Sequence, residues 1–349
     1  MALSILKGQI PKLSRKYNAW YFSQRLSGDV QRPQPGSRYV KPVLGIKKYL
    51  AQKYSAFVEG YERILQKNFP SAFRIYQIFS IGTKDLLTDM KEYLRISHEL
   101  RHGKSVRDLT RKELETYFQT PKDMKKVAPI LVIAALPFTN YIVFPLVIWF
   151  PHYVLSTHFW TIQQRVDFAL RRHRKKLYNY RPVFRQLQSK VLTVSDDNLK
   201  NRCEAILSQI GSGVHPRVDE ILKVKSLFVD DPYGLWTLKD SHMHSLCRMH
   251  GLSTLPGKRH RLWSHAGFVR EMDLAIIRDG LNNMKFDELR WACFLRGLSP
   301  LGLPKSEIIM WLEQWIYIAK NIDNHSLSLL LHCPILLAYN FHSNWVLIH

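Results

Sequence analysis

Residues 127–150 read VAPILVIAALPFTNYIVFPLVIWF, and no Asp, Glu, Lys or Arg occurs from Val127 to Gln164. As a helix rising ~1.5 Å per residue, a run of ~24 residues would reach ~36 Å, which exceeds the ~30 Å hydrocarbon core of a bilayer. A buried helix of a soluble protein is the alternative, but such helices are rarely this long without a charge. The stretch therefore predicts a transmembrane segment over 127–150.

Three prolines interrupt this segment, namely Pro129, Pro137 and Pro145. Each removes a backbone donor and kinks a helix. Lipid tolerates such breaks only where neighbouring groups or water satisfy the freed carbonyls. We expect a proline-kinked single transmembrane helix, with a re-entrant loop or a place in a homo-oligomer as the forms left open. Asn140, near the middle, would need a polar partner.

The N-terminal 40 residues carry seven Lys and Arg side chains and a single acid, Asp29. Serines and aromatic residues are interspersed, and no unbroken apolar run follows the first charges. This composition is typical of a mitochondrial transit peptide, with a disordered basic tail as the alternative. We predict a transit peptide over 1–40 and a mitochondrial location.

The whole chain is strongly basic. Lys and Arg number 51 against 28 Asp and Glu, a formal net charge of +23. Such an excess indicates an anionic partner, such as acidic lipid, nucleic acid or a ribosome, or a compartment whose proteins are basic. The four cysteines form no CxxC pair, which argues against a zinc ribbon, a redox dithiol or a disulfide scaffold, and predicts buried thiols.

The region 41–126 shows helical periodicity throughout. Pro70 interrupts the pattern, an apolar stretch from Phe73 to Ile81 ends at Gly82, and a further helix is expected over 83–101. Strand-like alternation and repeated Gly-x-Gly motifs do not occur, which disfavours nucleotide-binding α/β folds.

Beyond the apolar segment, Thr161 is placed to cap a helix that runs to about residue 190. Its sequence RRHRKK is a cationic patch for acidic lipid or ribosomal RNA, or else a solvated helix face. Further on, His244, Cys247 and His250 share a helical stripe but lack a visible fourth ligand, so no metal and no cofactor is expected. The predicted contacts with an anionic partner are Arg171, Arg172, Arg174, Lys175 and Lys176.

The most specific helical pattern lies near the C-terminus, where Phe286–Leu298 and Lys305–Ile316 form a helix–loop–helix unit. Gly297 suits the left-handed residue that ends the first helix, and Pro304 suits the start of the second. Units of this shape occur in SAP-type DNA-binding modules. This one is slightly acidic and cannot neutralise phosphates, so no DNA is expected as a partner. The first helix should bury Phe286, Leu289, Ala292 and Cys293, and Leu327–Phe341 should be a core helix.

Two of these motifs resemble a known family, the LETM proteins, whose name stands for leucine zipper, EF-hand and transmembrane. Residues 135–146, followed by Trp149-Phe-Pro and Ser156-Thr-His-Phe-Trp160, are similar to its transmembrane signature. Leu289–Trp315, with its Ala-Cys-x-x-Arg-Gly-Leu core, is similar to its ribosome-binding-like matrix domain. The resemblance covers roughly 125–349, and neither an EF-hand loop nor a heptad run is found in it.

The resemblance implies that the C-terminal domain faces the matrix, although the local charge rule favours the opposite orientation. It also implies association with mitochondrial ribosomes or, as the alternative, a part in a cation/proton exchange system. Ser/His/Asp, Cys/His and metal-hydrolase arrangements are not recognisable, so we predict that the protein is not an enzyme.

Together these features predict an all-α protein with one membrane-spanning helix and a helical ribosome-binding-like domain. It should lie in the mitochondrial inner membrane, with the outer membrane left open, and support mitochondrial organisation and respiration. The predicted domains are the transit peptide 1–40, a helical region 41–126, the transmembrane segment 127–150 and the LETM-type domain 161–349.

Overall fold

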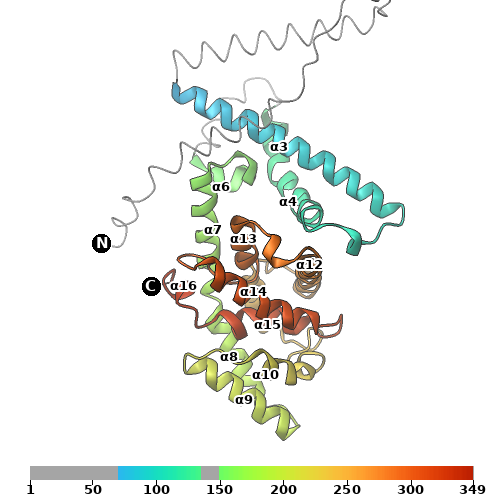
Figure 1. Ribbon diagram of the computed structural model, residues 1–349, viewed down its shortest axis with the longest axis vertical. Helices are drawn as coiled ribbons and strands as arrows, with labels where there is room; N and C mark the ends of the chain where they lie inside the picture. Colours follow the sequence, from blue (N-terminus) through green and yellow to red (C-terminus); the bar gives the residue numbers. More distant parts are fainter. Residues whose placement is uncertain (1–69, 135–148, 349) are drawn as a thin grey trace, which may run out of the picture. The chain divides into compact units, whose positions relative to one another are not determined.

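The computed structural model describes residues 70–134 and 149–348, and the described helices belong to one unit, Ser71–His349 (Figure 1). Every regular element in these two ranges is helical, which confirms the predicted fold class at the level of its secondary structure. The predicted transit peptide, the helices expected before residue 70 and residues 135–148 of the apolar segment lie outside the described ranges.

The helices follow one another along the chain with short connections. They are α3 (Pro70–Arg101), α4 (Arg111–Ala134), α6 (Pro151–Val154), α7 (Ile162–Leu177), α8 (Tyr180–Val191), α9 (Asp197–Gly211), α10 (Val218–Lys223), α11 (Asp240–His250), α12 (Lys258–Asp279), α13 (Phe286–Leu295), α14 (Lys305–Lys320), α15 (Leu327–Ala338) and α16 (His342–Trp345). Short 3-10 turns lie between some of them: η2 (Val106–Asp108), η3 (Thr157–Phe159), η4 (Lys225–Phe228) and η5 (Leu281–Asn283).

The core is built around α15. All twelve of its residues are buried, and it packs against α8, α12 and α14. Its uniformly apolar sequence leaves no polar side to face water, so neighbouring helices must cover it all round. The prediction that this stretch is a core helix is confirmed. The indole of Trp311 on α14 donates to the Leu337 carbonyl at 2.9 Å and anchors the two helices to each other.

The helix–loop–helix unit is also confirmed as α13 and α14. Gly297 has φ +92°, the left-handed conformation expected after the first helix, and Pro304 directly precedes the second. One side chain differs from the prediction. Phe286 is 42% exposed and lies beside the Arg290 guanidinium, because the first residue of α13 points away from the face that buries Leu289 and Cys293.

A buried carboxylate joins three parts of the core. Asp273 on α12 accepts hydrogen bonds from the Arg296 guanidinium, with Nε at 2.8 Å from Oδ1, and from the Trp315 indole at 3.0 Å from Oδ2. Arg296 also donates to the Ala292 carbonyl at 2.8 Å. All three side chains are almost completely buried. Every strong polar group is thus paired, which is the condition under which burying an ion pair is tolerable.

The N-terminal helix differs from the prediction at Gly82. A helix boundary was expected there, but α3 runs through this glycine without interruption. A Cβ at position 82 would lie 2.7 Å from Cδ1 of Phe159 and 2.9 Å from the His158 carbonyl oxygen. The glycine therefore permits close packing of η3 on α3, where the sequence pattern suggested a stop.

The helix expected from Thr161 to about residue 190 is in fact two helices, α7 and α8, separated at Tyr178 and Asn179. Pro182 provides the physical reason. It has no N–H to donate to the Tyr178 carbonyl four residues earlier, so one continuous helix would lose a bond at this point.

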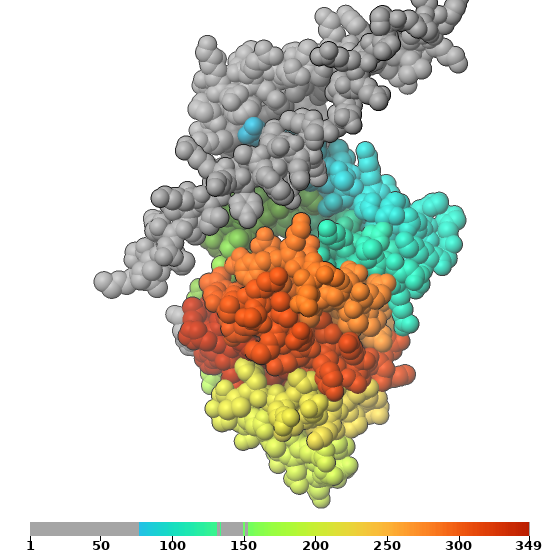
Figure 2. All heavy atoms as spheres, in the orientation of Figure 1, coloured from blue at the N-terminus to red at the C-terminus, as the bar shows by residue number. Residues whose placement is uncertain are grey.

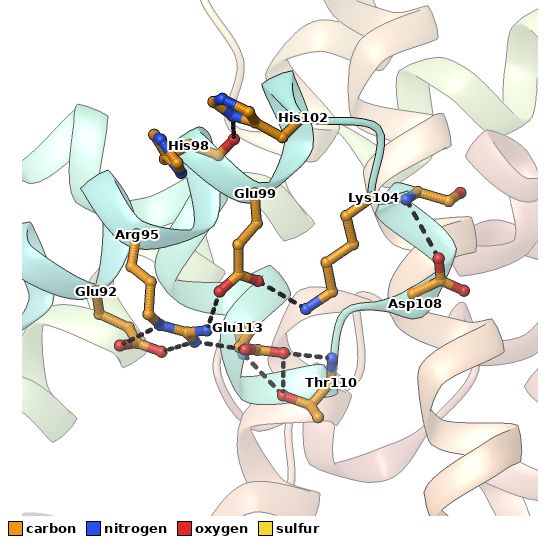
Figure 3. Close-up of polar contacts among 10 residues, drawn as sticks. Glu92, Arg95, His98, Glu99, His102, Lys104, Asp108, Thr110 and Glu113 are labelled. Carbon is orange, nitrogen blue, oxygen red and sulfur yellow. Dashed lines mark hydrogen bonds and ion pairs between the residues drawn. The ribbon is translucent and has the colours of Figure 1, made fainter.

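A polar network closes the hairpin between α3 and α4 (Figure 3). Arg95 forms ion pairs with Glu92, Glu99 and Glu113, and Lys104 pairs with Glu99 at 2.8 Å. Glu113 also accepts from the Thr110 backbone, and this bond with that of Arg95 lowers the pKa of Glu113 to about 2. The network fixes the direction in which α4 starts.

Two arginines then fasten this hairpin to the core. Arg278 on α12 donates to the Leu109 carbonyl at 2.7 Å, and Arg111 on α4 pairs with Glu288 on α13 at 2.8 Å. In the space-filling view, the surfaces of α4 and of α12 and α13 adjoin each other (Figure 2). The hairpin is therefore held at both strands of its turn.

We expect Asp273→Ala to lower the free energy of unfolding by about 3–5 kcal/mol, because Arg296 would be left charged and buried without a partner. Urea unfolding of the purified chain measures this loss. The control is Asp287→Ala, which removes an exposed pair with Arg290 at 3.9 Å and should cost less than about 1 kcal/mol. Equal losses in the two variants would show that the buried carboxylate has no special role.

Candidate anion-binding site on α7 and α4

The start of α7 is fixed by a capping box. Thr161 Oγ1 accepts from the Gln164 backbone at 3.2 Å, and Gln164 Oε1 accepts from the Thr161 backbone at 3.0 Å. Two otherwise unpaired donors of the first turn are thereby satisfied. The predicted cap at Thr161 is confirmed. Because the start is fixed, the rotational position of each basic side chain along α7 is fixed as well.

The structure divides the five predicted contact residues between two sides of α7. Helical spacing places Arg171, Arg174 and Lys175 together, and all three are exposed. Arg172 and Lys176, four residues apart, form a second stripe. His173 is buried, with Nε2 3.1 Å from Oδ1 of Asn344. The run is therefore not one patch, as the sequence suggested.

The first side is referred to below as the outer basic face and consists of Arg171, Arg174 and Lys175. Arg174 donates from Nε to the hydroxyl of Tyr178 at 3.2 Å. Within residues 70–134 and 149–348, no carboxylate lies within ion-pairing distance of these three side chains. Their charge is therefore available to an external anion.

The second side faces α4 across the indole of Trp160. Lys126 Nζ lies 4.6 Å from the centroid of this ring, and Cζ of Arg172 lies 5.7 Å from it. Trp160 is buried and packs edge-on against Phe168, with centroids 4.8 Å apart, while Arg172 Nε donates to the Phe168 carbonyl at 3.4 Å. One aromatic ring thus brings a cation from α4 next to a cation from α7.

Lys176 lies one turn further along the same side of α7, against α11. A Cβ at Gly251 would be 2.8 Å from Cε of Lys176, so the lysine stem occupies the space that a larger residue would need. Gly251 ends α11 with φ +71°, a conformation that glycine adopts without strain. The close approach of Lys176 thus depends on a glycine at this helix end.

Four side chains form the inner cationic cluster, namely Lys122 and Lys126 on α4 and Arg172 and Lys176 on α7. Burial, reinforced by repulsion from Arg172, lowers the pKa of Lys126 to about 8. Burial, with repulsion from Arg172 and Lys122, lowers the pKa of Lys176 to about 8 as well. The pKa values of Lys122 and Arg172 are also lowered, chiefly by burial.

Asp123 is the acid that interacts with this cluster, and it does not neutralise it. Its carboxylate is buried and accepts a bond from Gln119 at 3.2 Å, and burial raises its pKa. In the described part of the chain, none of the four cations has a carboxylate within 4 Å. The cluster therefore holds more positive charge than its surroundings balance.

The histidines and the cysteine considered as metal ligands do not converge. His250 Nε2 bonds the Leu331 carbonyl at 2.9 Å, and Cys247 Sγ points to the Lys258 carbonyl at 3.9 Å. Among the described residues, no three His, Cys, Asp or Glu side chains are grouped so as to hold a metal ion. All four cysteines are buried free thiols, as predicted.

Two features of the interior could not be read from the sequence. His242 and His332 face each other with their Nε2 atoms 3.0 Å apart, and burial lowers the pKa of both rings. Lys122 and Lys126 had been interpreted only as charges beside the apolar segment. Their spacing of four residues was the available signal that they share one face of α4.

Comparisons with known proteins agree with these features. A family model described as "LETM1-like, RBD" matches residues 109–336. LETM1 domain-containing protein 1 of Xenopus tropicalis is 33% identical over 296 residues, 84% of each chain, and its Homo sapiens counterpart is 30% identical over 316 residues, 88% of each chain. The mitochondrial proton/calcium exchanger protein of Drosophila melanogaster is 25% identical over 247 residues, 69% of this chain and 24% of that protein.

We expect Lys176→Met to stabilise the protein at pH 7 by about 1–3 kcal/mol, since about 1.4 kcal/mol accompanies each pKa unit. The unfolded chain, with a lysine pKa near 10.4, binds more protons than the folded chain above pH 8. Stability of the unmodified protein therefore rises from about pH 8 to 10.4, and the advantage of the variant shrinks over that range. Thermal unfolding at several pH values tests this, with exposed Lys175→Met as the control. A pH-independent loss of stability would contradict it.

Proposed function

The chain belongs to the LETM1-like family, and on this premise we propose that it is a non-enzymatic mitochondrial inner-membrane protein that binds an anionic partner through α7. The family match supports this proposal, as does the Drosophila relative, whose name places that protein in mitochondria. The basic, acid-poor N-terminus agrees with the same location. The observation that carries the proposal is the outer basic face, three exposed cations on one helical stripe without carboxylate partners in the described structure.

Membrane attachment is assigned to the apolar segment 127–150. No helix within residues 70–134 and 149–348 has the length and apolar character needed to cross a membrane. Residues 135–148 fall outside those ranges, so a span there stays a prediction. Residues 127–134 continue α4, which begins at Arg111, instead of starting a separate helix.

The two flanks of this segment support one particular form of attachment. α4 ends at Ala134, α6 begins at Pro151, and the two helices contact each other. Val127 and Ile130 of α4 share one buried cluster with Leu155 and Phe159, which follow the segment. A crossing of the ~30 Å hydrocarbon core would place the flanks on opposite sides.

The length between the flanks leads to the same proposal. The sixteen residues 135–150 would reach ~24 Å as a helix, less than the core thickness. Of the three forms that the sequence left open, we therefore favour the re-entrant loop, which enters and leaves the membrane from one side. The helical domain would then lie wholly on that side.

We expect single cysteines at the exposed positions Lys125 and Arg165 to react with an impermeant maleimide from the same side of the inner membrane. Labelling of intact mitochondria and of inverted inner-membrane vesicles measures this, and the unmodified chain, whose cysteines are buried, is the control. Labelling from opposite sides would support the single span instead. Complete release of the protein by alkaline carbonate would exclude both forms.

For the outer basic face, we propose the RNA backbone of the mitochondrial ribosome as the partner. Exposed arginines and lysines bind phosphates with little sequence preference, and the affinity falls as salt displaces the released counterions. The RBD family match and the resemblance to a ribosome-binding-like domain favour a ribosome over free nucleic acid. Acidic lipid is the competing partner for this face.

We expect the triple variant Arg171→Glu, Arg174→Glu, Lys175→Glu to bind purified mitochondrial ribosomes at least ~10-fold more weakly. Its slope of log affinity against log salt should fall by roughly 2–3, since each phosphate contact contributes roughly 0.7–0.9. The matched control reverses three exposed charges elsewhere, Arg202, Lys223 and Lys305, and should bind as before. Ribosome binding that is unchanged in the triple variant, with lipid binding lost, would transfer this face to the membrane.

A part in cation/proton exchange is the second candidate, because the Drosophila relative is named a proton/calcium exchanger. This chain matches only 24% of that protein, so the activity does not follow from the match. Flux assays with the pure protein in liposomes decide the point. Absence of potassium, calcium and proton movement would remove this candidate.

A further inference from the structure

We propose that the inner cationic cluster is a binding site for the phosphate group of an acidic membrane lipid. The cluster consists of Lys122, Lys126, Arg172 and Lys176, none of which belongs to the outer basic face. The choice of a lipid as the source of the phosphate rests on the membrane attachment proposed above. The site itself rests only on contacts within the described helices.

The first argument is the geometry of the four cations. The indole of Trp160 lies 4.6 Å from Lys126 Nζ and 5.7 Å from Cζ of Arg172, so one ring sets the position of both. Lys122 Nζ lies 5.8 Å from the Phe268 ring, and Gly251 receives the stem of Lys176. Each stem is thus supported by an aromatic ring or a glycine, while Lys122 and Arg172 keep solvent access. Supported cations of this kind are positioned before a ligand arrives.

The second argument is the charge balance. Asp123 and the histidines His250 and His265 are the titratable groups that also face the cluster, from α4, α11 and α12. Burial lowers the pKa of both histidines, and the Nε2 atom of His265 is shielded from solvent without a hydrogen-bond partner. Mutual repulsion contributes to the lowered pKa values of Lys126 and Lys176. A bound anion of charge −1 or −2 would relieve this repulsion, and phosphate offers several acceptors to such a set of donors.

The third argument distinguishes a lipid from other phosphates. Trp149 is 75% exposed and Ile162 is 79% exposed, and Phe150 and Val166 are exposed as well. Ile162 lies ten residues before Arg172 on α7, which corresponds to ~15 Å along the helix axis. Apolar side chains beside a cationic cluster suit the boundary between acyl chains and head groups. A free phosphate or an RNA backbone would make no use of them.

The two stretches that build the cluster also adjoin the apolar segment. Lys122 and Lys126 precede it on α4, and Arg172 and Lys176 follow it on α7. Because α4 and α6 contact each other, the cations from both flanks meet on the same side. Head-group phosphates lie at the point where a segment enters a bilayer, so the cluster would lie at their level.

The test measures binding of a short-chain phosphatidic acid to the full chain in neutral detergent by native mass spectrometry. We expect the double variant Lys126→Met, Lys176→Met to bind it at least ~10-fold more weakly, since two charge-assisted contacts are lost. The same variant should unfold at an equal or higher temperature at pH 7, so that weaker binding cannot be attributed to misfolding. The matched control, Arg171→Met, Lys175→Met on the outer basic face, should bind the lipid as the unmodified chain does.

Three further ligands complete the test. A short-chain phosphatidylcholine that binds as tightly as the phosphatidic acid would overturn the proposal, because apolar contact alone would then explain binding. Inorganic phosphate that competes at equal concentration would assign the site to a free anion and overturn the lipid source. A ribosomal RNA fragment whose binding is lost in the same double variant would give the cluster to RNA. Retained ribosome binding and unchanged cysteine labelling in the double variant separate failure here from failure of the proposed function.

Discussion

The carboxylate of Asp273 is the point from which the rest of the arrangement follows. It is buried on α12 and receives hydrogen bonds from Arg296, after α13, and from Trp315 on α14. A buried charge is tolerated only when its partners are fixed, so these bonds set the positions of three helices at once. α12 in turn packs against α4, α11, α14 and α15. The helix that carries the carboxylate therefore determines where α4 lies, and with it one half of the inner cationic cluster.

The cluster exists because two independent constraints meet. Arg278 on α12 and the pair of Arg111 with Glu288 hold the start of α4 against the core. The capping box at Thr161 and the buried ring of His173 hold α7 in one rotation. With both helices fixed, the cations of the two cannot move apart along the backbone, and only side-chain rotation can reduce their repulsion. Crowded cations are a cost to stability that folding alone does not require, which is why a ligand is the simplest explanation for them.

Much of the fold could be predicted from residues that act locally. Thr161 as a cap, Gly297 as a left-handed residue and the uniformly apolar α15 each carry their signal within a few positions. The misjudged positions depend on distant contacts. Gly82 was read as a helix end because no local pattern reveals the Phe159 ring 2.7 Å from its missing Cβ. Phe286 was placed in the core because periodicity does not show that the first residue of α13 faces outward. The candidate site divides in the same way, since RRHRKK is visible as a basic run but the division of its side chains needs Lys126 and Trp160 from elsewhere.

The division of the basic run also bears on how one short helix could serve a membrane protein. Arg171, Arg174 and Lys175 face outward and can meet a large partner at any angle, since their side chains are free to adapt. Arg172 and Lys176 are restrained by Trp160 and Gly251, so they select a small anion at a fixed position. His173 lies between the two sets and is buried against Asn344, which keeps the helix from rotating to exchange them. A helix fixed in this way can hold a lipid phosphate on one side while a ribosome or other anionic partner occupies the other. Lipid contact and partner binding would then be separable properties of the same twelve or so ångströms of backbone, about eight residues at 1.5 Å each.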